Sequence, residues 1–249
     1  PLDEKFQAAQ KEFAKKYNIS REAQDEFALR SHQRSSAARE RGFFAEEITP
    51  VSLTEIAVKE DKRTETKFVV KEDEGIRKET TLEALSALKP VFANNGTVTA
   101  GNASQTSDGA AFVLVMSERM MKQLGLQPVG RIVSCAVAGV DPLYMGIGPC
   151  AAIPKALSAA SKTLQDITLI ELNEAFASQS LAVIREAGLD PERVNVNGGA
   201  IALGHPLGCS GARLTMTLLH ELKSRKETLG IVTACVGGGQ GIAAVIESY

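Results

Sequence analysis

Residues 229–246 read LGIVTACVGGGQGIAAVI. Two apolar runs enclose a turn that is nearly all glycine, which predicts two antiparallel strands joined by a hairpin. Cys235 stands at the end of the first run, where several unshielded N–H groups would stabilise a thiolate or a developing oxyanion. A tight turn beside a small buried cysteine explains the same residues, because free cysteine is among the most buried residue types. On this stretch alone both interpretations stay open.

The chain before this hairpin alternates between apolar runs and helical patterns. This alternation predicts a layered α/β sheet, in which reactive groups collect at strand ends. The predicted strands are 110–116, 131–138, 167–171, 229–234 and 242–246, and the predicted helices are 117–124, 149–161, 173–187 and 208–224.

The first 90 residues have a different character, since they hold 35 of the 58 charged residues and only 2 of the 21 glycines. Helical spacing predicts amphipathic helices that cover another part of the molecule. Short extended segments and a solvated charge run follow them. These expected elements are a helix through Leu2, Phe6, Ala9, Phe13 and Tyr17, a helix from the N-cap Ser20 to Arg41 stopped by Gly42, extended segments at 50–58 and 66–70, the charged run 60–79, and a short helix from Thr80 or Thr81 to Leu88.

Composition excludes several classes of protein. The 249 residues are 44% hydrophobic, enough for one large domain or two small ones, and the net charge of −2 gives no reason to expect nucleic acid or an acidic membrane surface as a partner. Four widely spaced cysteines favour a reducing compartment. The sequence has no signal-peptide core and no apolar run of membrane-spanning length, so we expect no membrane insertion. A first residue other than Met suggests a processed or excised chain.

Residues 198–213 form a glycine-laden loop that enters a helix, and its one imidazole, His205, lies between Gly204 and Pro206. Glycine allows close backbone approach to a ligand and proline stiffens the neighbouring position, so His205 is a candidate base. A hydrogen-bonded structural histidine is the alternative. His205 and Cys209 lack a second pair of metal ligands, so no metal site is predicted.

Two further polar segments stand beside predicted strands. Asn173 follows the strand 167–171, where its amide would orient a water molecule, although on these residues alone an ordinary helix N-cap is the favoured interpretation. The small, polar loop 101–111 is suited to an extended ligand or is merely a turn.

Four motifs, in this order and spacing, resemble the thiolase family: Gly-Asn-Ala-Ser at 101–104, Asn-Glu-Ala-Phe at 173–176, Gly-His-Pro at 204–206 and Cys-x-Gly at 235–237. The resemblance runs from about Ile19 to the end of the chain and is strongest to degradative 3-ketoacyl-CoA thiolases. It implies the thiolase-type layered α/β/α fold. Residues 1–90 would belong to the helical loop domain, 91–127 to the end of the N-terminal half-domain with its last strands, and 128–249 to a complete C-terminal half-domain.

The resemblance also implies a reaction, the thiolytic cleavage of a 3-ketoacyl-CoA by CoA or the reverse Claisen condensation, through an acyl-cysteine. His205 would be the base that activates the nucleophilic cysteine. Cys235 would be a second cysteine that moves protons. Asn173, through a held water, and the Gly237 N–H would each serve an oxyanion hole. Ser104, Arg77 and Met145 match positions that line the CoA pocket.

One departure from the family concerns the nucleophile. In thiolases it lies in the N-terminal third, on a stretch that this sequence does not contain, and Cys135, Cys150 and Cys209 do not match it. Three interpretations remain: part of a working thiolase, either truncated or paired with a separate chain that carries the nucleophile; a non-catalytic CoA-binding or structural fragment; or a hydrolase that uses Cys235 and His205.

The family further implies the ligands and partners of the protein. CoA and acyl-CoA would be substrates, and no cofactor would be bound permanently. We expect a homodimer or homotetramer in the cytoplasm, or in a mitochondrion or peroxisome in a eukaryote.

Overall fold

The computed structural model describes residues 13–59 and 62–249. Of the first expected helix, residues 13–16 are helical, while Leu2, Phe6 and Ala9 lie outside the described residues. The same holds for residues 60 and 61 of the charged run.

The C-terminal half is built on a four-stranded mixed sheet in the order β3-β6-β5-β4. β5 is parallel to β4 and antiparallel to β6, which is in turn antiparallel to β3. The predicted antiparallel connection after residue 236 is therefore confirmed. The strands are β3 (Gly130–Gly139), β4 (Leu169–Leu172), β5 (Leu229–Val236) and β6 (Gln240–Ser248).

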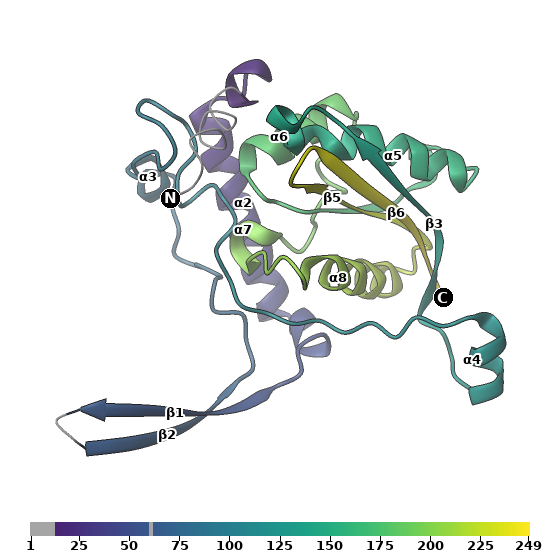
Figure 1. Ribbon diagram of the computed structural model, residues 1–249, viewed down its shortest axis with the longest axis horizontal. Coiled ribbons are helices and arrows are strands. Elements are labelled where there is room, and N and C mark those ends of the chain that lie inside the picture. Colours follow the sequence, from purple (N-terminus) through teal and green to yellow (C-terminus); the bar gives the residue numbers. More distant parts are fainter. Residues whose placement is uncertain (1–12, 60–61) are drawn as a thin grey trace.

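Helices cover both faces of this sheet (Figure 1), with α5 and α6 on one face and α8 on the other. One apolar core, which includes Ile231 and Val245, fills the α5 side, and a second, which includes Leu222 and Ile246, lies under α8. The predicted layered α/β arrangement is thus confirmed in this half. The elements around the sheet are η2 (Pro142–Ile147), α5 (Gly148–Ala159), η3 (Leu164–Asp166), α6 (Ala177–Glu186), α7 (Ala200–Leu203) and α8 (Ser210–Arg225).

Helix α2 (Arg21–Glu40) packs against α6 and α7 and has the predicted ends. The Ser20 hydroxyl accepts a hydrogen bond from the Ala23 N–H at 3.1 Å, and Gly42 follows the helix with φ +79°. A left-handed backbone suits glycine and stops the helix. A 3-10 turn, η1 (Phe43–Glu46), comes next.

A two-stranded hairpin projects from the body of the molecule (Figure 1). It consists of β1 (Val51–Lys59) and β2 (Lys62–Val70), which are antiparallel, and all but the last of their 18 residues are exposed. The predicted extended segments are therefore present, and the described charged residues of β2 are solvated as expected. The short helix α3 (Leu82–Ser86) follows, with Thr81 as its N-cap.

The predicted strand at 110–116 is wrong. These residues run extended along the side of the molecule that carries α8 and lead to α4 (Glu118–Leu124), but they pair with no strand of the described chain. A strand needs a neighbouring edge for its N–H and C=O groups. Phe112 is 92% exposed and Leu114 is 79% exposed, so the apolar pattern that predicts a buried strand is left facing solvent.

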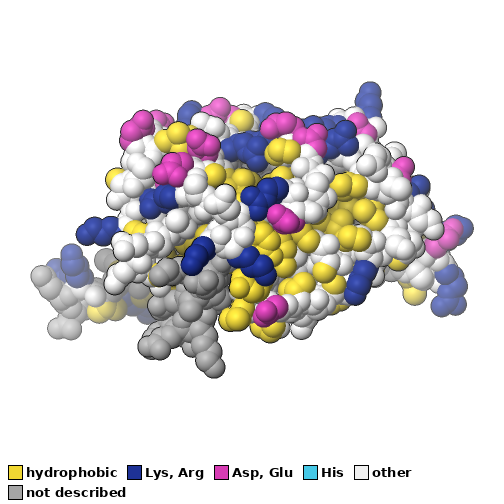
Figure 2. All heavy atoms as spheres, turned by 90° about the horizontal axis from the view of Figure 1, so that it is seen from above, with side chains coloured by type: hydrophobic (Ala, Val, Ile, Leu, Met, Phe, Trp, Pro, Cys, Tyr) yellow, Lys and Arg dark blue, Asp and Glu magenta, His cyan; other side chains and the backbone are white. Residues whose placement is uncertain are grey.

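Apolar atoms also gather on the face of the molecule seen from the side of α5 and α6 (Figure 2), with charged side chains around them. Helix α5 contributes, because Lys155 is its one charged residue and Pro154 and Ala159 are exposed. Within the described residues, no helix is long and apolar enough to cross a membrane.

Candidate active site at the ends of β4 and β5

Asn173 and His205 meet at the C-terminal end of β4. Asn173 directly follows the strand, and its N–H donates to the Thr233 carbonyl of β5 at 3.0 Å, so the parallel pairing of the strands continues to this point. Its side-chain Nδ2 lies 3.2 Å from His205 Nε2. The N-cap of α6 is Phe176, so the interpretation of Asn173 as an ordinary helix cap is wrong.

The other nitrogen of His205 is held by Ser210. Nδ1 lies 2.6 Å from Ser210 Oγ, which in turn donates to the Pro206 carbonyl at 3.1 Å. A hydroxyl has one proton, so this pattern assigns a proton to Nδ1 and leaves Nε2 as an acceptor for the Asn173 amide. His205 is therefore bonded on both sides, and the lone pair of Nε2 faces the Asn173 amide.

Burial lowers the pKa of His205, and the positive charge of Arg213 lowers it further. Both effects favour the neutral ring, which is the form that accepts a proton. A structural histidine would satisfy the same two hydrogen bonds. A general base additionally needs a neutral ring, which the lowered pKa favours.

Cys235 lies near the end of β5, one strand away from Asn173. It packs against a small apolar cluster that includes Phe176 and Met145. Burial raises the pKa of the Cys235 thiol to about 11. The thiol is therefore protonated at neutral pH, so the expectation that nearby N–H groups stabilise a thiolate in the resting protein does not hold.

The glycine run after Cys235 contains two kinds of glycine. A Cβ on Gly237 would meet no atom within 4 Å, so the space beside its backbone is open. A Cβ on Gly239 would lie 2.4 Å from the Val140 carbonyl oxygen, and one on Gly241 would lie 2.1 Å from the backbone of Gly148. The later glycines are needed for packing, whereas Gly237 leaves room for a ligand.

The predicted CoA-binding residues separate into two groups. Met145 lies beside Cys235 in the apolar cluster, and the Ser104 N–H donates to the Ala175 carbonyl at 3.0 Å, two residues after Asn173. Arg77 is exposed, and its backbone N–H bonds His32 Nδ1 at 3.2 Å. Met145 and Ser104 thus join the site, while no hydrogen bond or ion pair within residues 13–59 and 62–249 connects Arg77 to it.

Neither nitrogen of His205 bonds Cys235, which argues against a Cys-His hydrolase pair. The other thiols also lie elsewhere: Cys135 is exposed on β3, and burial raises the pKa of Cys150 to about 11. Burial also raises the pKa of Cys209. Among the described residues, no group of three or more His, Cys, Asp or Glu is placed to hold a metal ion.

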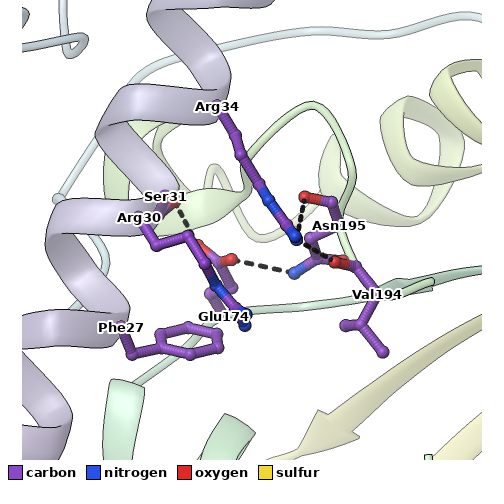
Figure 3. Close-up of a pocket in the computed structure, with 7 residues that line it drawn as sticks. All are labelled: Phe27, Arg30, Ser31, Arg34, Glu174, Val194 and Asn195. Carbon is purple, nitrogen blue, oxygen red and sulfur yellow. Dashed lines mark hydrogen bonds between the residues drawn. The ribbon is translucent and has the colours of Figure 1, made fainter. Parts of the chain in front are cut away.

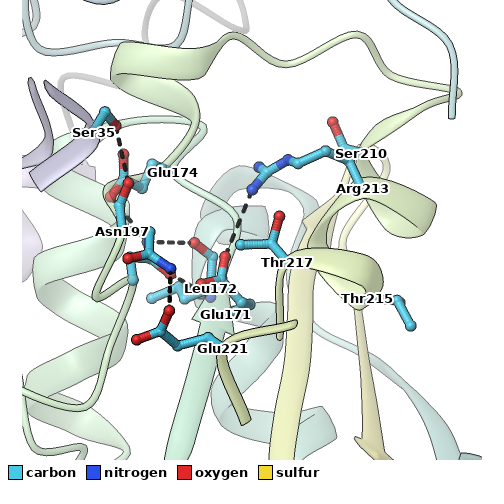
Figure 4. A network of polar contacts seen from close by, with 12 residues as sticks. Ser35, Glu171, Leu172, Glu174, Asn197, Ser210, Arg213, Thr215, Thr217 and Glu221 are labelled. Atoms are coloured by element: carbon cyan, nitrogen blue, oxygen red, sulfur yellow. Dashed lines mark hydrogen bonds and ion pairs between the residues drawn. The ribbon is translucent and has the colours of Figure 1, made fainter. Parts of the chain in front are cut away.

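Sequence reasoning missed a buried polar network behind the site (Figure 4). Glu171, on β4, lies 3.6 Å from Arg213 of α8, and burial raises the pKa of Glu171 to about 8 despite that charge. Asn197 Nδ2 donates to Glu221 at 2.8 Å. A glutamate inside the apolar run 167–172 was the available signal, because a buried carboxyl group requires a partner.

A second missed group is the buried Glu174, which accepts from Ser31 Oγ at 2.7 Å, Asn195 Nδ2 at 2.9 Å and the Ile201 N–H at 3.1 Å. It lines a narrow pocket, open to solvent and without room for a ligand, between α2 and the segments that hold Glu174, Val194 and Asn195 (Figure 3). Arg34 spans this pocket and donates to the Val194 carbonyl at 2.8 Å. The pocket is therefore a junction that fastens α2 to the sheet, and it is separate from His205.

Comparison with known proteins agrees with this architecture. The thiolase N-terminal domain model matches residues 4–119, and the thiolase C-terminal domain model matches residues 126–248. The first match begins before Ile19, so the similarity to the family starts earlier than the motifs indicate.

Three relatives illustrate the similarity. The 3-ketoacyl-CoA thiolase of Bacillus subtilis is 57% identical over 94% of this chain and 60% of its own length. The crystal structure of Bacillus anthracis acetyl-CoA acetyltransferase is 49% identical, with a TM-score of 0.90 over 97% of this chain and 59% of its own. Human mitochondrial 3-ketoacyl-CoA thiolase in complex with CoA is 46% identical, with a TM-score of 0.86 over 97% of this chain and 58% of its own.

The chain thus spans about three fifths of the length of the relatives that it matches. The two domain matches and the structural agreement together show that it belongs to the thiolase family.

Proposed function

We propose that this chain supplies the base, the proton-moving thiol and the oxyanion-binding groups of a thiolase reaction, the cleavage of a 3-ketoacyl-CoA by CoA or its reverse. The nucleophilic cysteine would come from a segment that the chain does not contain. The observation that carries the proposal is the contact between Asn173 Nδ2 and His205 Nε2 at 3.2 Å, at the same sheet edge as Cys235.

In this mechanism His205 Nε2 takes the proton of the nucleophilic thiol. The thiolate attacks the 3-keto carbonyl, the carbon–carbon bond breaks, and an acyl-cysteine and the acetyl-CoA carbanion form. The neutral ring that burial and Arg213 favour is the form that this step needs. The amide of Asn173 would hold the water of one oxyanion hole, and the Gly237 N–H, beside open space, would serve the other.

Cys235 would then give its proton to the carbanion. The resulting thiolate takes a proton from the incoming CoA thiol, which attacks the acyl-cysteine and releases acyl-CoA. A thiol whose pKa is raised to about 11 is suited to both steps. It is protonated before the carbanion forms, and its thiolate is a stronger base than the thiolate of a cysteine with the ordinary pKa of 9.0.

Met145 and Ser104 would line the pantetheine arm of CoA, because both lie at the edge that carries Cys235 and Asn173. Arg77, which is exposed on a separate segment, would reach the nucleotide end of the ligand. The chain would divide into the parts 1–90, 91–127 and 128–249, and the family matches, which leave only residues 120–125 between them, support the second boundary. CoA and acyl-CoA would be substrates, with no permanent cofactor, in the cytoplasm or a eukaryotic organelle.

The test is complementation. This chain is co-expressed with the part of the Bacillus subtilis thiolase that it does not cover, and loss of acetoacetyl-CoA is followed with and without CoA. We expect turnover that needs both chains and CoA, and that falls at least 100-fold with His205→Asn or Cys235→Ala. Turnover that survives both substitutions would contradict the assigned roles.

The non-catalytic alternative predicts a different result in the same experiment. A CoA-binding fragment would bind CoA by titration calorimetry, form the mixed complex and never acquire an acyl group on cysteine. Mass spectrometry of the mixed complex after incubation with acetoacetyl-CoA separates the two functions. Light scattering on the chain alone and on the mixed complex tests the expected dimer or tetramer.

A further inference from the structure

The ring of His205 is held from two different elements. Asn173, at the end of β4, bonds Nε2, and Ser210, the first residue of α8, bonds Nδ1. The Ser210 contact is held within the turn of residues 205–210, where the Ser210 hydroxyl also bonds the Pro206 carbonyl, so the contact between Nε2 and Asn173 depends on the spacing between β4 and the start of α8. A group that fixes this spacing would keep both hydrogen bonds of the ring in place at once.

Glu171 and Arg213 are placed to do so. Glu171 is two residues before Asn173, on the same face of the strand, and Arg213 is one turn of helix after Ser210. The distance from Arg213 Nη1 to Glu171 Oε2 is 3.6 Å, and Figure 4 shows the arginine reaching from α8 to the carboxyl group. The side chain of Glu171 is 3% exposed.

We propose that the buried Glu171–Arg213 pair is a positioning pair, which holds the end of β4 against the first turns of α8 and thereby fixes the tautomer and orientation of His205. It rests on the proposed function only in treating His205 as the base. Neither residue touches the ring, so both act through Asn173 and Ser210.

The surroundings of the pair explain why the two residues depend on each other. Within the described residues, neither Nη atom of Arg213 has a hydrogen-bond partner, and Glu171 Oε2 has none either. The Arg213 guanidinium keeps its charge at any pH, and the Glu171 carboxyl group 3.6 Å away is the group that offsets its burial, while Arg213 acts to lower the pKa of Glu171 against the effect of burial. The charged groups that act on Glu171 are Arg213, Glu47, Glu174 and Glu221, and Arg213 also acts on His205.

The experiment measures the tautomer of His205 in the full 249-residue chain, by long-range ¹H–¹⁵N correlation of the imidazole rings. His32 and His220 serve as internal references. We expect the wild-type ring to carry its proton on Nδ1, as the Ser210 contact requires. In Glu171→Gln and Arg213→Met we expect the signal to move towards the Nε2–H form that an unconstrained imidazole prefers, while His32 stays unchanged.

Arg225→Met is the matched control. This substitution removes an arginine at the end of α8 that is remote from His205. The Arg225 guanidinium pairs with Glu221 of the same helix at 2.5 Å. We expect the His205 signal of this variant to match the wild type. If Arg213→Met does not fold, the tautomer of His205 is measured in two milder variants. Glu171→Gln keeps the size of the side chain, and Arg213→Lys keeps the charge.

A His205 tautomer that is unchanged in the folded Glu171→Gln and Arg213 variants overturns the proposal. The same variants in the mixed complex separate it from the proposed function. We expect kcat to fall by about 10- to 100-fold with KM unchanged, as displacement of a catalytic group produces. A shifted tautomer in an inactive complex would support the positioning pair and contradict the thiolase activity.

Discussion

The C-terminal sheet uses apolar side chains in the opposite way to two earlier segments, the β1–β2 hairpin and residues 110–116. Around the sheet, residues such as Leu222 and Ile231 are completely buried, and β5 and β6 are paired along their whole length. In the earlier part, the 110–116 segment and the β1–β2 hairpin expose apolar residues such as Phe112 and Val58. The sheet is therefore covered by its own helices and by α2, whose Phe27 joins the core, whereas the 110–116 segment and the β1–β2 hairpin expose apolar side chains to solvent.

The largest loss of stability is expected in the buried core around the sheet. Leu222→Ala on α8 removes a buried side chain and should lower the free energy of unfolding by about 2–5 kcal/mol. The matching substitution in the exposed 110–116 segment, Phe112→Ala, should change the free energy of unfolding by less than about 0.5 kcal/mol, because the ring is already in water. Urea titration of the two variants measures both. A large loss in Phe112→Ala would mean that the 110–116 segment is covered in solution.

An intermediate effect is expected inside the glycine run. Gly241→Ala places a Cβ against the Gly148 backbone and should destabilise the chain by about 1–3 kcal/mol. Gly237→Ala meets open space, so we expect little change in stability but a loss of thiolase turnover in the mixed complex. Thermal unfolding and the complementation assay measure the two quantities. Equal destabilisation by both substitutions would remove the distinction between packing and ligand-facing glycines.

The smallest effect concerns reactivity and leaves the fold unchanged. With its pKa at about 11, Cys235 should hold about 100-fold less thiolate at neutral pH than a thiol at its ordinary value of 9.0, so iodoacetamide should label exposed Cys135 first. Since the folded pKa is raised, stability should fall as pH rises from about 9 to 11. Peptide mapping after labelling measures which cysteine reacts first. The pH dependence of unfolding in Cys235→Ala, compared with the wild type, measures the effect of the raised pKa on stability. Rapid labelling of Cys235 at neutral pH would contradict its burial.

Local signals predicted most of the fold. Ser20 and Gly42 mark the ends of α2 because a side-chain cap and a left-handed backbone are properties of single residues. The glycine turn after Cys235 marks the β5–β6 hairpin for the same reason. The strand expected at 110–116 failed because pairing depends on a neighbour, and no pattern within one segment reveals whether that neighbour is present.

The site was predicted unevenly. His205 and Asn173 carry motifs, and the structure places them in contact. Ser210, Glu171 and Arg213 were missed, since their importance lies in which element each one faces across the fold. A serine five residues after the histidine and a glutamate in an apolar strand become informative only when α8 is packed on β4.

The loop before the 110–116 segment lies against the histidine loop: a Cβ on Gly109 would be 2.6 Å from Pro206, and one on Gly204 would be 2.2 Å from Ser107 Oγ. A strand that pairs with residues 110–116 would therefore arrive next to His205. Pairing of that strand with residues 110–116 and completion of the site around His205 would then happen together. Under the thiolase function proposed above, an unassembled chain would leave CoA thioesters intact, and turnover would report that the complex is complete.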